Sequence, residues 1–442
     1  MARTDAQTDA AREHAQALLS RLGVSVPVPE RTAPATPAEL WARSGAMALT
    51  GFAEGPPLSA PGPLAACAEG ALLALRALAP EAPLPADGAA LLGEHAACLG
   101  YRRRGRISAG GSCRLLRTAD GWLAVNLARR DDVAAVPAWL ECEAGDDVWG
   151  VVEREVAWRK TAELLERGWL LSLPLAAALP PPERAPDWLT SGTAQLGEAL
   201  PAAPARAPLV VDLTSLWAGP LCTSLLACAG ARVVKVESTG RPDGARGGSA
   251  HFFDLLNGDK ASVALDFRSE AGRAALRALV DRADLVVEGT RPRALAQLGV
   301  DAEAFVAGRP GRTWVSITGY GRRDPAPGRV AFGDDAAVVA GLAVATALHH
   351  GEDAPLFCAD AIADPLSGLH AAVAAWAAWT TGGGWLLDIA LRDVAGHALA
   401  AGPAGPATSE PAAPPRARPA ARSARPLGAD TQAVLRELPL RC

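Results

Sequence analysis

The stretch from 209 to 237, LVVDLTSLWAGPLCTSLLACAGARVVKVE, constrains the fold of this chain more than any other. A short apolar run ends in Asp212, Leu213 and Thr214, and a turn of small residues then leads into an apolar helical run. Gly230 ends that run before a second β-branched run begins. Strand, tight turn, helix and strand in this order form a βαβ unit, in which two parallel strands are joined by a crossover helix. The stretch therefore predicts a parallel sheet covered by helices.

Later stretches repeat the same alternation. SVALDF, LVVEG and WVSITGYG predict strands at 262–267, 285–289 and 314–321, and a helix is predicted over 269–283. Strands that alternate with helices of this length are typical of a doubly wound sheet. The predicted fold class is α/β, with a mostly parallel, Rossmann-like sheet in a large domain. A smaller α+β domain is expected from the N-terminal half.

The rest of the chain predicts connectors and one hairpin. Residues 1–38 read as a helix followed by a Pro-rich connector, and a second helix is expected over 64–78. The alternating run 107–127 turns at Asp120-Gly121, which predicts a β-hairpin with a type I′ turn. The Pro-rich composition of 179–207 predicts a linker. The segment after 400 lacks an apolar period, which predicts disorder up to a last short helix.

Composition and charge exclude several classes of protein. A net charge of −5 argues against a general nucleic-acid binder. The N-terminus has no apolar core of a signal peptide, and the Ala-rich run after 359 is broken by Asp360, Asp364 and Pro365, which favours a buried helix over a membrane span. The eight cysteines form no CxxC pair. We therefore expect a cytoplasmic protein with free thiols, no metal and no membrane partner.

Two carboxylates stand before that Ala-rich helix. An Asp followed by Pro is typical of a helix start, where Asp364 would cap the backbone and Pro365 would occupy the first turn. A helix N-terminus also favours an ionised carboxylate, which is what a nucleophile requires. Spacing alone favours the cap, and one residue can fill both roles. No G-x-G-x-x-G fingerprint follows the first strand, so a dinucleotide site is not predicted.

Five stretches, in this order along the chain, resemble the class III CoA-transferase family. This CaiB/BaiF-type family includes formyl-CoA, carnitine and bile-acid CoA-transferases and α-methylacyl-CoA racemase. The stretches are VVDLTSLWAGPLCTSLLACAGARVVKVE, FFDLLNGDKASVALDF, LVVEGTRPRALAQLG, WVSITGYG and ADPLSGLHAA. The resemblance implies a CoA-binding and catalytic domain at 208–400, a partial and degraded copy of the family's second half at 39–178, and a tail at 401–442. The order is therefore rearranged, with a partial duplication.

The resemblance also implies residue roles. It places the family's nucleophilic Asp on Asp364, whereas the echo of this segment near residue 64 has Ala66 at the aligned position. Binding of coenzyme A or an acyl-CoA substrate, with no metal, is expected at eight positions. They are Leu216, Trp217, Lys235, Arg241, Arg246, Asn257, Lys260 and Gly289. Family members form interlocked dimers, so the resemblance implies a homodimer.

Three functions remain open at this stage. The first is transfer of CoA between an acyl-CoA thioester and a carboxylic acid through an aspartyl mixed anhydride and thioester. The second is racemisation or isomerisation of an acyl-CoA by proton transfer, which the segment Gly333-Asp334-Asp335 disfavours because racemase-like members carry a His there. The third is acyl-CoA binding without catalysis, because Gly289 and Gln297 replace the Asn and Arg that are common in the family.

Overall fold

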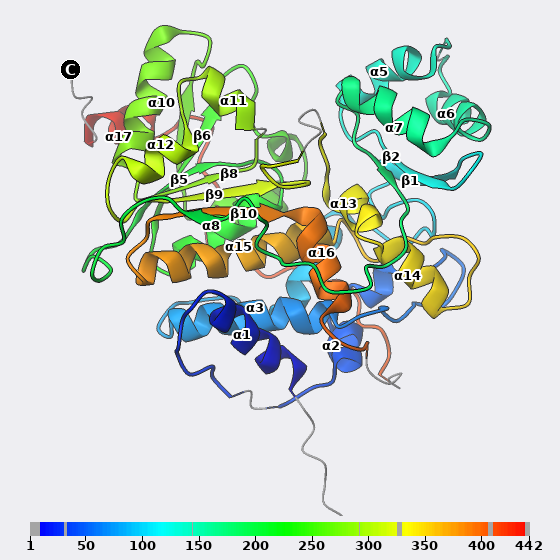
Figure 1. Cartoon of the computed structure of the whole chain (residues 1–442), viewed down its shortest axis with the longest axis horizontal. Coiled ribbons are helices and arrows are strands. Elements are labelled where there is room, and N and C mark those ends of the chain that lie inside the picture. The colour runs from blue at the N-terminus through cyan, green and yellow to red at the C-terminus, as the bar shows by residue number, and fades with distance from the viewer. Residues whose placement is uncertain are drawn as a thin grey trace, which may run out of the picture.

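The structure is a computed structural model that describes residues 9–30, 33–143, 145–290, 292–324, 329–404 and 410–437. It contains a seven-stranded sheet with helices on both faces and a smaller domain with a three-stranded sheet beside it (Figure 1). The predicted α/β class with a mostly parallel sheet is confirmed. The boundaries predicted for the domains stay a prediction.

The large sheet has the strand order β4-β10-β9-β8-β5-β6-β7. Every neighbouring pair is parallel except β4 and β10, which are antiparallel. Inner strands are buried along most of their length because both of their faces are covered by helices. The strands are β4 (Ala194–Gln195), β5 (Leu209–Leu213), β6 (Arg232–Ser238), β7 (Ala261–Leu265), β8 (Leu285–Glu288), β9 (Thr313–Thr318) and β10 (Trp385–Ala390).

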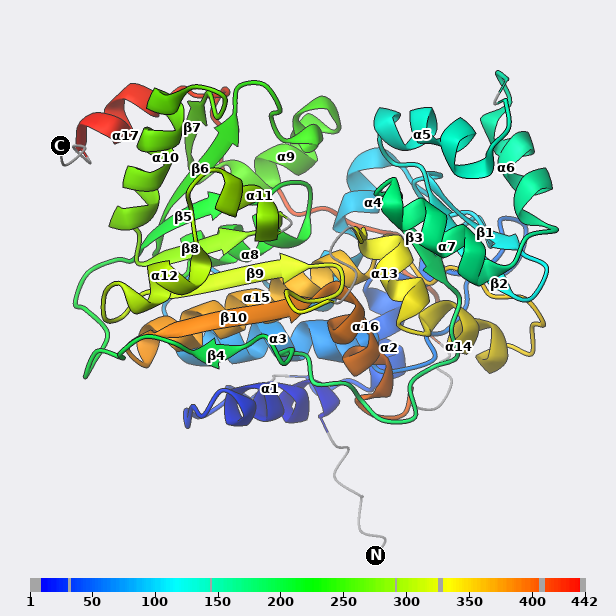
Figure 2. The same cartoon turned by 45° about the horizontal axis from the view of Figure 1, so that its top comes forward.

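Helices form a layer on each face of this sheet (Figure 2). One apolar core joins the sheet to α10 (Glu270–Arg282), α11 (Pro292–Gln297), α12 (Ala302–Ala307) and α17 (Thr431–Glu437). A second core lies on the opposite face. It is built from α8 (Ala218–Cys228), α9 (Ala250–Asn257), α15 (Ala363–Thr380) and α16 (Leu391–Ala400).

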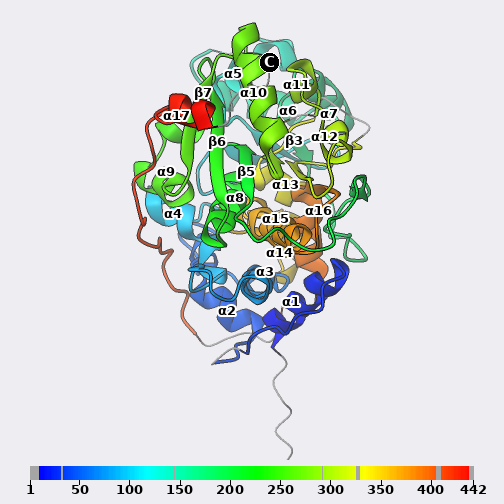
Figure 3. The same cartoon turned by 90° about the vertical axis from the view of Figure 1, so that its left-hand side faces the viewer.

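N-terminal helices add a further layer beneath α15 (Figure 3). They are α1 (Ala10–Arg21), α2 (Pro37–Arg43) and α3 (Leu64–Leu78). The predicted helix over 64–78 is therefore confirmed, and it packs against α15, the helix that it echoes in sequence. Ala66, the counterpart of Asp364, is buried among apolar side chains. Small residues permit this layering: a Cβ at Gly70 would lie 2.5 Å from the carbonyl oxygen of Ala11.

The Ala-rich run forms α15, which lies between the sheet and α3 and is buried along most of its length, as predicted. Its small side chains let two neighbouring layers approach it closely. Among the residues that the structure describes, no helix has both the length and the apolar character needed to cross a membrane.

The smaller domain has its own core and an antiparallel sheet in the order β1-β2-β3. Its elements are β1 (Cys113–Arg117), β2 (Trp122–Asn126), α5 (Arg130–Leu140), α6 (Val148–Val156), α7 (Thr161–Leu170) and β3 (Leu175–Ala177). The short helices α4 (Glu94–Leu99) and α13 (Gly333–Val339) lie between the two domains, and α14 (Leu342–His349) lies below the smaller domain (Figure 2).

The hairpin at 107–127 is confirmed, but its turn is not type I′. Arg117 pairs with Trp122, so the loop between them has four residues, and neither Asp120 nor Gly121 has a positive φ. Asp120 instead accepts hydrogen bonds from the amide and hydroxyl of Thr161 at 2.9 and 2.8 Å. These contacts with α7 replace the local turn geometry that the Asp-Gly pair favours.

Two segments predicted from composition as a linker and a disordered tail are ordered in the described residues. The linker contributes β4 to the sheet, and the Thr190 hydroxyl donates to Asp388 Oδ2 at 2.6 Å. The tail at 410–430 runs extended along the protein, where Arg418 binds the carboxylate of Glu94 at 2.8 Å. For the described part of the tail the prediction of disorder was wrong, because backbone and arginine hydrogen bonds hold it and Ala417 and Ala420 pack against the core. Residues 405–409 lie outside the described residues.

Candidate active site

A cavity of about 330 Å³ opens at the carboxyl ends of β5, β8 and β9. Chain order reverses between β5 and β8, since β6 and β7 continue on one side of β5 while β8, β9 and β10 build the other. Open parallel sheets bind ligands in the crevice at such a switch point. Three of the predicted site residues, Leu216, Gly289 and Asp364, line this one cavity although they are far apart in sequence.

Asp364 lies in the first turn of α15 and faces the cavity. The prediction that it caps this helix was wrong: the N-cap is Ile362, and Asp364 Oδ2 instead accepts the N–H of Gly333 at 3.2 Å. Burial raises the pKa of Asp364 to about 7, although the Gly333 hydrogen bond and the nearby His95 oppose this shift. The carboxylate is therefore freed from a capping role and titrates near neutral pH, which suits a group that attacks or exchanges protons.

Three of the five described non-Gly residues with a positive φ lie in the turn that contains Leu216 and in the loop just before Asp364. Leu216 has a φ of 69°, and Ala359 and Ala361 have φ values of 62° and 40°. This left-handed region costs an L-residue with a side chain about 1–2 kcal/mol. Such residues persist where the surrounding structure over-determines them, which is common at functional sites.

A group of buried carboxylates lies behind Asp364. Asp334 Oδ1 accepts the N–H of Ala361 at 2.9 Å, and Asp335 Oδ1 accepts the N–H of Phe332 at 3.0 Å. Burial raises the pKa of Asp334 to about 8 and that of Asp335 to about 7. Among the described residues, no group of three or more His, Cys, Asp or Glu side chains has the arrangement of a metal site.

The N-terminal half supplies two partners to these carboxylates. Asn126 Nδ2, at the end of β2, donates to Asp335 Oδ1 at 2.9 Å. His95 Nδ1, on α4, lies 2.8 Å from Asp360 Oδ2. Sequence reasoning missed both residues, because neither stands in a motif and each comes from a segment more than two hundred residues from its partner.

The two residues at the tip of the first turn have opposite environments. Leu216 is 41% exposed and lines the cavity, as a residue that contacts a ligand must be. Trp217 is buried, with its ring centroid 4.9 Å from that of His95 and 5.5 Å from that of Phe252. Trp217 therefore anchors the turn to α4 and α9, and its ring does not line the cavity.

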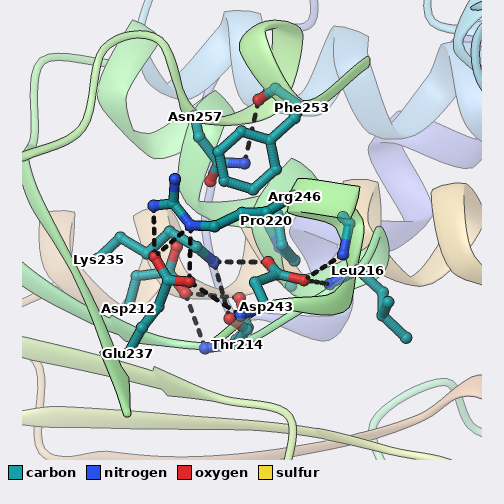
Figure 4. A network of polar contacts seen from close by, with 12 residues as sticks. Asp212, Thr214, Leu216, Pro220, Lys235, Glu237, Asp243, Arg246, Phe253 and Asn257 are labelled. Atoms are coloured by element: carbon teal, nitrogen blue, oxygen red, sulfur yellow. Dashed lines mark hydrogen bonds and ion pairs between the residues drawn. The ribbon is translucent and has the colours of Figure 1, made fainter. Parts of the chain in front are cut away.

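Both lysines among the predicted CoA contacts, Lys235 and Lys260, are buried in a network of charges next to the turn. Figure 4 shows the part of this network around Lys235. Lys235 Nζ lies 3.0 Å from Asp243 Oδ2, and Lys260 Nζ lies 3.0 Å from Asp212 Oδ2. Burial lowers the pKa of Lys260 to about 8, whereas the carboxylates of Asp212 and Asp243 outweigh burial and raise the pKa of Lys235. With side chains only 1–2% exposed, neither amine can meet a phosphate in this conformation.

The other predicted contacts divide between the surface and the interior. Arg241 is exposed, whereas Arg246 donates to both oxygens of the Glu237 carboxylate, at 2.9 and 2.6 Å. Asn257 is buried and accepts a hydrogen bond from Lys260 at 3.0 Å. A Cβ at Gly289 would have the carbonyl oxygen of Ile317, at 3.8 Å, as its nearest neighbour, so the cavity has room for a side chain there.

Comparison with known proteins identifies a family and several relatives. The model of "CoA-transferase family III" matches residues 208–429. A succinyl-CoA–D-citramalate CoA-transferase from Chloroflexus aurantiacus is 30% identical over 42% of this chain and 48% of its own length. A formyl-CoA:oxalate CoA-transferase from Escherichia coli is 30% identical over 42% of this chain and 46% of its own.

A solved structure of a CaiB/BaiF family protein from Brucella suis is 29% identical, with a TM-score of 0.37 over 45% of this chain and 56% of that one. The chain spans about half the length of the curated relatives it matches. The matched region contains the cavity, the turn at Leu216 and Asp364, while His95 and Asn126 lie outside it.

Proposed function

The chain belongs to CoA-transferase family III, and on this premise we propose that it moves coenzyme A between an acyl-CoA thioester and a carboxylic acid. The observation that carries the proposal is the position of Asp364, which shares a cavity at the switch point of the sheet with Leu216 and Gly289. The matched region thus places the Asp364 carboxylate beside any ligand that binds against the turn between β5 and α8.

In the proposed reaction Asp364 is the nucleophile. Its carboxylate attacks the thioester carbonyl and the C–S bond breaks, which gives a mixed anhydride and the CoA thiolate. The thiolate then attacks the aspartyl carbonyl, so that the acid leaves and an aspartyl CoA thioester forms. The acceptor carboxylate attacks this thioester, and return of the thiolate to the new anhydride releases the new acyl-CoA and restores Asp364.

Three features of this chain support that role. The N–H of Gly333 fixes one oxygen of Asp364 at 3.2 Å. Because Asp364 stands in the first turn of α15, the helix dipole favours its anionic form. A pKa of about 7, raised by burial, keeps a substantial ionised fraction at neutral pH while leaving the carboxylate poorly solvated and therefore reactive.

Proton transfer on an acyl-CoA is the second candidate function. It is favoured by the raised pKa values of Asp364 and Asp334, about 7 and about 8, which burial causes and which suit a general acid or base. The structure also brings His95 next to Asp360 at 2.8 Å, so a histidine is present although the family's usual position lacks one.

An exchange assay separates these functions. The protein is incubated with an unlabelled acyl-CoA, the matching carbon-13 acid and deuterated water, and the acyl-CoA is analysed by mass. Transfer predicts carbon-13 in the acyl-CoA that disappears in Asp364→Asn. Deuterium at the α-carbon without carbon-13 would instead establish proton transfer. Neither label, with CoA bound, would leave an acyl-CoA-binding protein and overturn both catalytic proposals.

A further inference from the structure

The turn at the rim of the cavity is held by an ion pair from outside the turn. Lys235 Nζ donates to the carbonyl oxygen of Thr214 at 2.9 Å, and Asp243 Oδ1 accepts the N–H of Leu216 at 3.0 Å. Lys235 Nζ and Asp243 Oδ2 are in turn 3.0 Å apart. The two peptide groups on either side of Ser215 are therefore fixed by the two members of one ion pair (Figure 4).

This arrangement opposes a specific strain. Leu216 has a φ of 69°, a conformation that an L-residue with a branched side chain avoids without support. Its side chain and that of Ser215 are exposed on the cavity side, while Thr214 and Trp217 on either side are buried. The ion pair therefore holds the one part of the turn that faces the cavity and that packing does not hold.

A second set of contacts fixes the near end of the turn. Asp212 Oδ1 accepts the N–H of Thr214 at 2.9 Å, and Asp212 Oδ2 accepts the hydroxyl of Thr223, on α8, at 2.7 Å. Lys260 completes this set through its ion pair with Asp212. Strand β5, helix α8 and the near end of the turn are thus linked independently of Asp243, so within this turn loss of Asp243 frees the Leu216 end. Asp243 Oδ1 also accepts the N–H of Ala245 at 3.0 Å, so the same loss uncaps the short helix at 244–247.

A buried ion pair is an expensive way to gain stability alone. Side chains of Lys235 and Asp243 are 2% and 0% exposed, and desolvation of both charges offsets much of their attraction. Apolar replacements of both partners are often neutral for stability, whereas removal of one partner leaves an unpaired buried charge. The backbone geometry that the Lys235–Asp243 pair imposes on the turn therefore explains its presence better than a gain in stability does.

We propose that Asp243, together with Lys235, is a positioning residue that sets the conformation of the Ser215–Leu216 turn for binding of acyl-CoA. Lys235, which the family resemblance assigns to CoA binding, thus acts on the substrate through the backbone of the turn. This inference rests on the proposed function, because that function identifies the ligand as acyl-CoA. The contacts by which Lys235 and Asp243 fix the turn do not depend on the proposed function.

The test uses two variants of the full chain and one matched control. Asp243→Ala removes the acceptor for the Leu216 N–H, and the double variant Lys235→Met/Asp243→Ala removes both charges. Asp284→Ala is the control. Asp284 is also buried, accepts a backbone N–H from Leu209 at 2.9 Å and pairs with Arg206 at 2.6 Å, but it stands at the opposite end of the sheet.

For wild type and each variant we would measure CoA affinity by calorimetry, stability by urea unfolding, and the hydrogen-exchange rate of the Leu216 amide. We expect both Asp243 variants to bind CoA at least about tenfold more weakly and to exchange the Leu216 amide faster, with the double variant regaining stability but not affinity. Asp284→Ala should lose stability with CoA affinity unchanged.

Two results would overturn the inference: affinity that recovers with stability in the double variant, or wild-type exchange at Leu216 in Asp243→Ala. If the wild-type protein itself does not bind CoA, the proposed function fails. In that case the exchange measurement still decides whether Asp243 holds the turn.

Discussion

His95 Nδ1 lies 2.8 Å from Asp360 Oδ2, and this contact joins the N-terminal half of the chain to the loop that precedes Asp364. The Asp360 side chain is only 3% exposed, and the ring of His95 also packs on Phe252 with centroids 4.6 Å apart. A histidine outside the region that matches the family thus fixes the backbone just before the proposed nucleophile.

Removal of His95 should weaken both the fold and the reaction. His95→Ala leaves the buried Asp360 carboxylate without this partner, at a cost of about 1–3 kcal/mol in the free energy of unfolding. Transfer should also slow, because the strained loop before Asp364 loses a tether. A double-mutant cycle with Asp360→Ala in urea measures the coupling, and His251→Ala, which changes an exposed histidine, is the control. Additive effects of the two substitutions would show that the pair is not coupled.

Activity should depend on the ionisation of Asp364. Because burial raises its pKa from the ordinary 3.8 to about 7, formation of the aspartyl adduct should increase with pH and reach half its maximum near pH 7. The folded state holds this proton more tightly than the unfolded chain, so the stabilisation is complete below pH 3.8 and is lost as pH rises through 7. Asp364→Asn should therefore gain stability relative to wild type as the pH rises from about 4 to about 7, and the difference should stay constant above pH 7. A pH-independent difference in urea unfolding would contradict this account.

A buried histidine pair predicts the opposite trend in acid. His370 Nδ1 lies 2.7 Å from the Leu366 carbonyl oxygen and so donates to it, which leaves His370 Nε2 to accept from His14 Nε2 at 3.1 Å. Burial lowers the pKa of His14 well below 6.5 and that of His370 to about 3.

Their contribution to stability is therefore complete above pH 6.5 and is lost as pH falls from 6.5 toward 3. The free energy of unfolding, measured in urea, should decrease over this range in wild type and less steeply in His370→Phe. His251→Gln should keep the wild-type slope. An unchanged slope in His370→Phe would contradict the assignment of a buried neutral pair.

Gly289 should accept the asparagine that is common in the family. A Cβ there has no heavy atom closer than 3.8 Å, and the φ of Gly289 lies outside the left-handed region, so Gly289→Asn should change stability by less than about 0.5 kcal/mol. We expect tighter CoA binding by calorimetry, since the side chain enters the cavity. Gly368→Ala is the contrast, because its Cβ would lie 2.6 Å from the carbonyl oxygen of Ala218. If Gly289→Asn were as unstable as Gly368→Ala, the claim that the cavity has room for a side chain at position 289 would be wrong.

Sequence patterns predicted the sheet because its inner strands are buried on both faces and are therefore rich in apolar and β-branched residues, as in Leu209–Leu213 and Leu285–Glu288. The position of Asp364 came from a family resemblance, and the structure places it in the cavity at the end of those strands. Its capping role was predicted from Asp-Pro spacing and failed, because the helix begins at Ala363 and the carboxylate turns toward Gly333.

The features that the sequence could not predict depend on contacts between segments that are far apart in the chain. A lysine after a strand resembles a solvated phosphate ligand, and only the fold shows that Asp243 and Asp212 surround Lys235 and Lys260. His95 carries no local signal for its contact with Asp360, which comes from the packing of α4 against the loop that precedes α15. The composition of the tail shows that it lacks an apolar period, but it cannot show that Arg418 hydrogen-bonds to Glu94.

Covalent trapping at Asp364 tests the central claim most directly. The protein is mixed with an acyl-CoA, quenched with hydroxylamine and digested, and the peptide that contains Asp364 is analysed by tandem mass spectrometry. We predict a hydroxamate on Asp364 that requires acyl-CoA and is absent from Asp364→Asn, with Asp334, Asp335 and Asp360 unmodified. An unmodified Asp364 under conditions in which acyl groups are exchanged, or a hydroxamate on another carboxylate, would contradict the assignment of Asp364 as the nucleophile.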